Sequence, residues 1–358
     1  MNIFDYTKYY CDYTFSDKSF NEVDNVIFSM LAYNNFEGIV KKNEKNKVTI
    51  EEASKLFFEK YTIEEIKNNI LAVREASKLL KLVSKTKRFK DIKMSNYTYV
   101  SNSNCQFSAV TFNLYDNTYY VAFEGTDELL SGWQEDCEMA YKFPVEAHTL
   151  SKKYLDKHFT VKRCNLIIGG HSKGGNLAMV SAMYANYFVK NKIIKVYSND
   201  GQGLRKAQID SKFYKKIEDK FIHIIPNYSI VGLLLRHTDN YIVVKSNKKG
   251  LLAHDATTWQ VSYDHFEKEK LSRFSKVFDE GFSTWLDKYD DEKRRLFVKN
   301  VFKIIKENNI ESLTEVRLKK ELIENVLKSS KNIDPLVKEM LVDLLKVVNK
   351  TNLEYPLF

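Results

Sequence analysis

Apolar side chains recur every three or four residues in the first part of the chain, which is the period of an amphipathic helix. Three stretches have this pattern: residues 20–33, 49–58 and 62–82. Each follows a polar residue that can cap a helix N-terminus, and the third has the capping-box spacing of Thr62 and Glu65. The other candidate caps are Asn21 or Asp24, and Thr49. We therefore predict a helical N-terminal segment over residues 1–94.

The pattern changes near residue 95 to short aromatic and β-branched runs bounded by turn residues. These runs predict strands at residues 97–100, 107–112, 118–123, 166–168, 193–198, 221–225 and 241–245. Helical patterns lie between the later runs, at 149–158 and from residue 174 onward. This alternation predicts a mostly parallel central sheet flanked by helices, so the expected fold class is α/β, with its core at residues 95–265.

After the predicted core, apolar residues return to helical spacing. The clearest stretches are residues 283–286, 296–305 and 336–348. We find no internal repeat and no catalytic motif there. We predict a helical C-terminal subdomain over residues 266–358 that packs on the core or binds a partner.

One run, residues 164–179, joins a short apolar strand to a helix through a glycine-rich turn. It contains Gly170-x-Ser172-x-Gly174, the pattern of a nucleophile elbow. Gly170 and Gly174 would let strand and helix approach closely, and the helix N-terminus would favour a developing negative charge. We therefore predict that Ser172 is a nucleophile. The alternative is an ordinary strand-to-helix turn with a bystander serine.

Composition narrows the class of protein. The 358 residues are 44% hydrophobic and 13% aromatic, enough to bury a substantial core in one large domain or two. The net charge of +9 permits peripheral contact with an anionic membrane, although such charge is more typical of a solvated surface. There is neither a zinc-finger pattern nor a basic run interleaved with aromatics, so we expect no nucleic-acid partner.

The cysteines and the N-terminus bear on location. The four cysteines are scattered without a C-x-x-C pair: Cys11, Cys105, Cys137 and Cys164. The first residues do not resemble a signal peptide, and no apolar run is long enough to span a membrane. We expect free thiols and a cytoplasmic protein. The histidines lack paired ligand spacing, so we expect no metal and no other cofactor.

Three stretches resemble one family pattern, that of lipase class 3 α/β-hydrolases. Residues 123–127 with 133–136 resemble their oxyanion loop, residues 170–178 their elbow, and residues 254–259 the segment that carries their histidine. The chain is more similar still to the bacterial Mbeg-like group, a related family of unknown function. The resemblance implies an α/β-hydrolase fold and a serine hydrolase that cleaves a carboxylic ester through an acyl-enzyme, with a lipid or acyl compound as the expected substrate.

Nucleophilic catalysis by Ser172 requires a base and a group that orients the base. His254 is the expected base, because it follows the last predicted strand and lies in the matching segment. Asp200 is the expected acid, because it ends the strand after that of the nucleophile; its alternative role is a turn residue. Asp239 and Asp255 are weaker candidates.

The expected oxyanion donors are the backbone N–H groups of Lys173 and Thr126, with the Thr126 hydroxyl as a third donor. Asp136 is expected to hold the Thr126 loop in place. Two histidines receive other roles: His171 is expected to support the turn, and His223 to be a hydrogen-bonded core residue within a strand.

The chain departs from the lipase class 3 pattern at two places. Glu124 stands where those proteins usually have Arg, and the loop at residues 226–232 lacks their catalytic carboxylate. The second departure motivates an alternative: a catalytically inactive hydrolase fold that acts as a binding or scaffolding module. A third hypothesis, a basic membrane-surface or nucleic-acid binder, depends on charge alone and requires salt-dependent binding.

Overall fold

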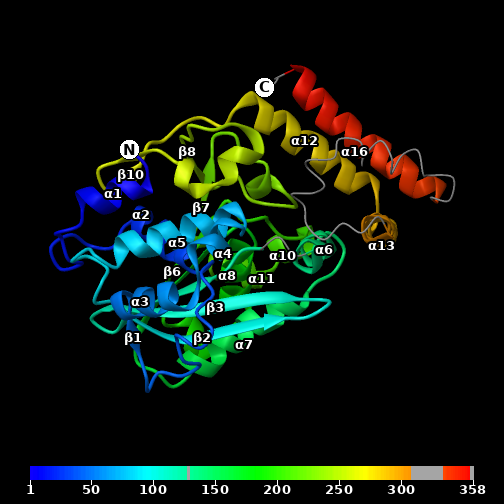
Figure 1. Cartoon of the computed structure of the whole chain (residues 1–358). Helices are drawn as coiled ribbons and strands as arrows, with labels where there is room; N and C mark the ends of the chain where they lie inside the picture. The colour runs from blue at the N-terminus through cyan, green and yellow to red at the C-terminus, as the bar shows by residue number, and fades with distance from the viewer. Residues whose placement is uncertain (127–129, 308–333, 355–358) are drawn as a thin grey trace.

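The computed structural model describes residues 1–126, 130–307 and 334–354. Its centre is an eight-stranded sheet in which the strands follow chain order, β1 to β8 (Figure 1). The strands are β1 (Val48–Thr49), β2 (Lys93–Ser101), β3 (Gln106–Tyr115), β4 (Thr118–Phe123), β5 (Asn165–His171), β6 (Ile193–Asn199), β7 (Phe221–Pro226) and β8 (Tyr241–Val244). Pairing is antiparallel from β1 to β4 and parallel from β4 to β8. The predicted α/β class and mostly parallel sheet are confirmed.

The N-terminal helices cover one face of this sheet. They are α1 (Ile3–Tyr9), α2 (Glu22–Leu31), α3 (Ile50–Lys60), α4 (Ile63–Lys67) and α5 (Leu71–Val83). Helix α2 contacts β4, β5 and β6, and its Phe28 ring packs 4.8 Å from the Phe112 ring of β3. These helices therefore share one hydrophobic core with the sheet.

The predicted caps are confirmed at Asn21, Thr49 and Thr62, each of which accepts a hydrogen bond from the first turn of its helix. The prediction of a single long helix over residues 62–82 is wrong, because the helix is interrupted between α4 and α5. There the Asn69 side chain accepts a hydrogen bond from the Ile70 N–H at 2.9 Å. Such a local bond competes with the helical one, so it favours a break.

A second set of helices covers the opposite face, so the sheet lies between two helical layers. They are α6 (Leu130–Glu138), α7 (Glu146–Phe159), α8 (Lys173–Tyr184), α9 (Tyr187–Lys190), α10 (Lys206–Ile209) and α11 (Lys212–Lys215). Helix α8 packs on β4, β5 and β6 and also on α7. Its Leu177 and Ala178 are fully buried, as expected for small or apolar residues of a helix that packs on a sheet.

The C-terminal helices are α12 (Arg273–Lys288), α13 (Asp291–Glu307) and α16 (Pro335–Glu354), which lie together at one side of the molecule (Figure 1). Trp285 of α12 donates a hydrogen bond to the Met340 carbonyl of α16 at 3.0 Å. Arg294 of α13 donates to the Ala140 carbonyl, just after α6, at 2.6 Å. The helical tail begins later than predicted, because β9 (Val261–Ser262) and β10 (His265–Phe266) form a small hairpin first.

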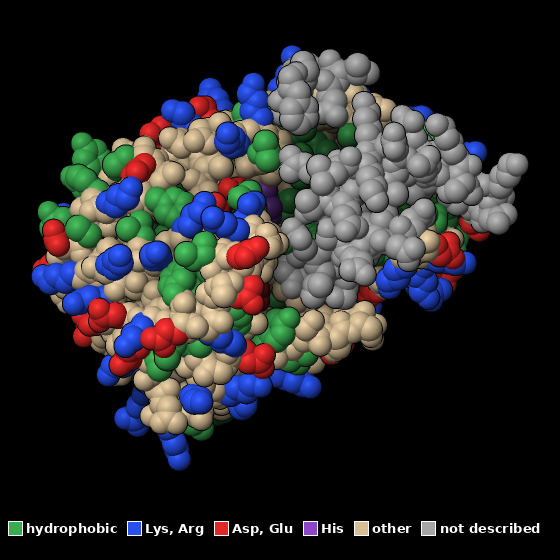
Figure 2. Space-filling model, in the orientation of Figure 1, with side chains coloured by type: hydrophobic (Ala, Val, Ile, Leu, Met, Phe, Trp, Pro, Cys, Tyr) green, Lys and Arg blue, Asp and Glu red, His purple; other side chains and the backbone are tan. Residues whose placement is uncertain are grey.

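The surface has a mixed character, and the cysteines are not paired. Figure 2 shows Lys and Arg side chains interspersed with acidic and apolar ones on the visible face. All four cysteines are free. Among the helices of the described ranges, none combines the length and the apolar character that a membrane crossing requires.

Candidate active site

Ser172 occupies the sharp turn between β5 and α8. Its backbone has φ 57° and ψ −132°, a conformation that a non-glycine residue rarely adopts and that is typical of a nucleophile elbow. The flanking glycines permit the turn: a Cβ on Gly170 would lie 2.3 Å from the Gly174 carbonyl carbon, and one on Gly174 would lie 2.1 Å from the Phe123 oxygen. The predicted strand–turn–helix geometry around Ser172 is therefore present.

Asp200 follows β6 and is fully buried. Its Oδ2 atom lies 2.6 Å from Nδ1 of His254, although 54 residues separate the two in sequence. Gly201 allows this loop to pack against the elbow, because a Cβ there would lie only 2.6 Å from the Ser172 carbonyl oxygen. The structure thus brings together the residues that sequence analysis selected as acid and base.

The second oxygen of Asp200 is held by the loop after β7. Oδ1 accepts a hydrogen bond from the Ser229 hydroxyl at 2.6 Å and another from the Gly232 N–H at 3.1 Å. This is the loop in which the sequence lacks the expected carboxylate. Its two donors instead bind the carboxylate that the neighbouring strand supplies, and they offset part of the cost of burying Asp200.

His254 ends the short 3₁₀ helix η3 (Gly250–His254), and its side chain is 23% exposed. A carboxylate accepts hydrogen bonds, so the Asp200 contact favours a proton on Nδ1 of His254 and leaves Nε2 as the acceptor. The alternative acid Asp255 does not bind this ring. It accepts hydrogen bonds from the N–H and hydroxyl of Thr257 and so caps the next 3₁₀ turn, η4 (Ala256–Thr258).

His171 holds the His254 segment against the elbow. Its Nε2 donates to the His254 carbonyl oxygen at 2.8 Å, and its Nδ1 therefore accepts from the Tyr33 hydroxyl at 2.9 Å. The two histidine rings lie 4.4 Å apart. Burial lowers the pKa of His171 to about 3, so the ring is neutral and keeps this donor pattern at neutral pH. Its supporting role thus extends beyond the turn predicted from sequence.

The backbone of Ser172 is tied to the end of β6. Its N–H donates to the Asn199 carbonyl at 3.0 Å. The Asn199 side chain is buried and donates to the Gly170 carbonyl at 3.1 Å, while its oxygen accepts from Asn25 of α2 at 2.8 Å. The N-terminal helical layer therefore helps to fix the turn that carries Ser172.

Asp136 of α6 holds the segment that follows β4. It accepts a hydrogen bond from the Thr126 hydroxyl at 2.5 Å and one from the Gln202 amide at 3.3 Å. The predicted supporting role of Asp136 agrees with this geometry. The expectation that the Thr126 hydroxyl is a third oxyanion donor does not agree with this geometry, because the hydroxyl hydrogen is directed to Asp136. Burial raises the pKa of Asp136 to about 6. Asp127 lies outside the described residues.

Sequence analysis missed the partner of the Lys173 side chain. The ammonium group is completely buried, lies 2.5 Å from Oε2 of Glu135 and donates to the Gln106 carbonyl at 3.0 Å. Glu135 also accepts from the Ala147 N–H at 2.9 Å. This ion pair joins α6, α7 and the start of α8. No signal in the sequence indicated this pairing, because 38 residues separate the two side chains.

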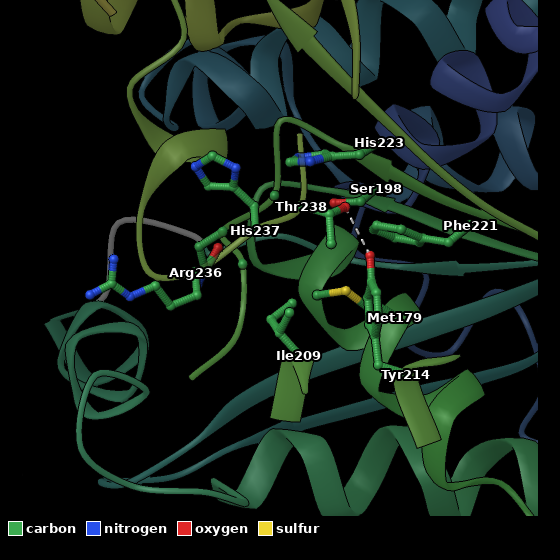
Figure 3. A pocket seen from close by; sticks show the side chains of 12 residues that line it. Met179, Ser198, Ile209, Tyr214, Phe221, His223, Arg236, His237 and Thr238 are labelled. Carbon is green, nitrogen blue, oxygen red and sulfur yellow. Dashed lines mark hydrogen bonds between the residues drawn. The ribbon is translucent and has the colours of Figure 1, made fainter. Parts of the chain in front are cut away.

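Two further histidines differ from expectation. His148 is buried and its Nε2 lies 2.7 Å from the amide oxygen of Asn176 in α8, a role that the sequence did not suggest. His223 is buried in β7 as predicted, but its Nε2 makes no hydrogen bond within the described structure. That ring borders a small cavity of about 10 Å³ behind the Asp200 loop, shown in Figure 3 beside Ser198 and Tyr214. A space of this size holds about one water molecule.

In the described ranges, no group of three or more His, Cys, Asp or Glu side chains has an arrangement suited to a metal ion. The candidate site brings together a serine on a strand-to-helix turn, a histidine and a buried carboxylate at the carboxyl edge of a mostly parallel sheet. These features define an α/β protein with its candidate site at the strand ends, where ligands bind in such folds.

Comparison with known proteins identifies the family of the chain. The Mbeg1-like family model matches residues 83–303, which is more than half of the chain, and the protein belongs to the Mbeg1-like family. Among solved structures, the chain is similar to the crystal structure of M37 lipase, with 16% sequence identity and a TM-score of 0.35. The match covers 58% of this chain and 67% of that one. No curated protein matches the chain.

Proposed function

We propose that the protein is a serine hydrolase that cleaves a carboxylic ester, with lipids or acyl compounds as the proposed substrate class. The observation that carries the proposal is the contact between Nδ1 of His254 and Oδ2 of the buried Asp200, 2.6 Å apart and beside the Ser172 elbow. A histidine oriented in this way can accept a proton from a serine hydroxyl. The strained turn at Ser172 is the conformation that such nucleophiles require.

In the proposed mechanism, Nε2 of His254 takes the hydroxyl proton of Ser172 as the oxygen attacks the ester carbonyl. The tetrahedral intermediate collapses to an acyl-enzyme, and His254 returns the proton to the departing alcohol. Water then attacks the acyl group with the same base, which releases the acid and restores Ser172. Asp200 keeps the imidazole in the required tautomer and stabilises its cationic form.

The developing negative charge would bind the backbone N–H groups of Lys173 and Thr126. Lys173 opens α8, where the first N–H groups of a helix have no partner within the helix and the dipole favours an anion. Each such donor is worth about 3 kcal/mol of transition-state stabilisation. Asp136 and the Glu135–Lys173 pair support this arrangement because they fix the segments that carry both donors.

The alternative proposal is a binding or scaffolding module without turnover. The sequence observation that supported it was the missing carboxylate at residues 226–232. Because Ser229 in that loop binds the carboxylate of Asp200, this support is weaker than the sequence suggested. The two proposals differ in whether hydrolysis depends on Ser172.

The test is hydrolysis of p-nitrophenyl esters from acetyl to palmitoyl by wild type, Ser172→Ala and His254→Ala. We expect kcat to fall by about 10⁴-fold or more in each variant. A fluorophosphonate probe should label wild type and leave Ser172→Ala unlabelled. Equal labelling of both proteins, or hydrolysis that survives Ser172→Ala, would contradict the proposal. No hydrolysis by folded wild type would favour the module.

A further inference from the structure

A second cavity, of about 210 Å³, opens on the N-terminal helical side of the sheet at the end of β4. Its volume is below the range of about 300–1,000 Å³ for drug-sized ligands, so it suits a compact group. Four aromatic rings and two carboxylates contribute to its wall: Tyr33, Phe57, Tyr61, Tyr99, Glu65 and Glu124. None of these residues has a role in the hydrolytic mechanism.

Through Tyr33, the wall of this cavity is connected to His171, the residue that precedes the proposed nucleophile. Phe123, at the end of β4, pairs with Gly170 of β5, so Glu124 follows β4 at the level of His171, the residue before Ser172. Tyr33 belongs both to the cavity wall and to the hydrogen bond with His171. Strand β2 runs parallel to β4, which places Tyr99 near the same edge of the sheet. A group bound here would be attached to an ester at Ser172 by a short linker.

The chemistry of the wall selects for a positive charge. Aromatic faces attract ammonium groups, and quaternary ammonium ligands are recognised by cages of such rings. The Tyr61 ring already contacts a cation, because the Lys60 ammonium, which lies outside the cavity wall, is 4.9 Å from the centre of that ring. Glu124 is buried, with 8% exposure, so its carboxylate acts through a medium of low dielectric. The same carboxylate disfavours an anionic ligand.

We propose that this cavity binds the ammonium group of the substrate, so that the preferred ester carries a quaternary or protonated amine close to the scissile bond. That the ammonium group belongs to a substrate rests on the proposed hydrolase function, but the binding of an ammonium ion can be measured without catalysis. It also gives a role to Glu124, one of the two places at which the chain departs from the lipase class 3 pattern.

The binding test uses isothermal titration of choline and of its uncharged carbon analogue, 3,3-dimethyl-1-butanol, into wild type and Ser172→Ala. Both proteins should bind choline about tenfold more tightly than the analogue, as expected for cation–π attraction assisted by a carboxylate. Equal affinity for the two compounds, or no choline binding, would overturn the inference. With wild type, choline esters should have a higher kcat/KM than 3,3-dimethylbutyl esters.

Variants identify the groups responsible. Glu124→Gln should weaken choline binding about tenfold and leave the analogue unaffected. Because Glu124 is buried, its variant is checked by circular dichroism. Should it fail to fold, Tyr61→Leu against Tyr61→Phe carries the test, since only the first removes the ring. Glu64→Gln, an exposed neighbour of Glu65 outside the cavity wall, is the matched control. Charge-dependent choline binding without any ester hydrolysis would support this site and contradict the proposed function.

Discussion

Asp200 combines a strained backbone with a fully buried carboxylate. Its φ is 48°, and its side chain accepts hydrogen bonds from Ser229, Gly232 and His254. Three donors around one carboxylate offset the cost of its burial and fix its direction toward the imidazole. A turn residue with only a conformational role would not require this arrangement.

We expect Asp200→Asn to lower kcat by about 10³- to 10⁴-fold, because an amide cannot hold His254 in the required tautomer. Asp255→Asn is the matched control, since Asp255 adjoins the histidine in sequence but binds Thr257. It should retain most of the activity. The measurement is steady-state hydrolysis of a p-nitrophenyl ester. An equal loss in both variants would show that Asp200 has no special role.

At the scale of elements, α6 is joined to the elbow helix through the buried Glu135–Lys173 pair. Removing one partner of such a pair leaves an uncompensated charge, whereas replacing both by apolar residues is often close to neutral. The pair therefore makes the position of α6, and of the Thr126 segment bound to it through Asp136, dependent on α8.

Glu135→Gln should lower the free energy of unfolding by about 3–5 kcal/mol, because the Lys173 ammonium stays buried. The double variant Glu135→Leu with Lys173→Met should lose less than the single one. Glu138→Gln on the same helix removes an exposed pair with Lys142 and should cost at most about 1 kcal/mol. Urea titrations measure all three variants. Similar losses for Glu135→Gln and Glu138→Gln would refute the assigned importance of the buried pair.

At the scale of the whole molecule, buried histidines make stability depend on pH. Burial lowers the pKa of His148 to about 4, of His171 to about 3 and of His223 to about 4, from the ordinary value of 6.5. Below pH 6.5 the unfolded chain binds protons at these sites while the folded chain does not. Their contribution to stability therefore falls as the pH falls from about 6.5 toward 4.

The variant His148→Gln isolates one such contribution from those of buried carboxylates, which act in the opposite direction. Between pH 7.5 and 5, the free energy of unfolding of wild type should fall by about 2 kcal/mol relative to this variant. His265→Gln, which replaces an exposed histidine, is the control for the substitution itself. Denaturant titrations at the two pH values give the comparison. A constant difference for His148→Gln would mean that the folded protein protonates His148 normally.

The sequence by itself determined what depends on neighbours along the chain. The caps at Asn21, Thr49 and Thr62 use donors two or three residues away, and the elbow at Ser172 uses glycines two residues away on either side. Strand and helix periods depend on local side-chain alternation, so the α/β class was also readable. Even so, the interruption between α4 and α5 was not predicted, because capping and periodicity are local rules that compete.

Only the tertiary structure decided which distant groups meet. The contact of Asp200 with His254 spans 54 residues, that of Glu135 with Lys173 spans 38, and that of Tyr33 with His171 spans 138. Sequence reasoning selected Asp200 and His254 as candidates, but the donors of the loop after β7 and the aromatic cavity beside Glu124 were not foreseen. Such partners depend on how strands align and helices pack, and no local period encodes the distance between side chains on separate elements.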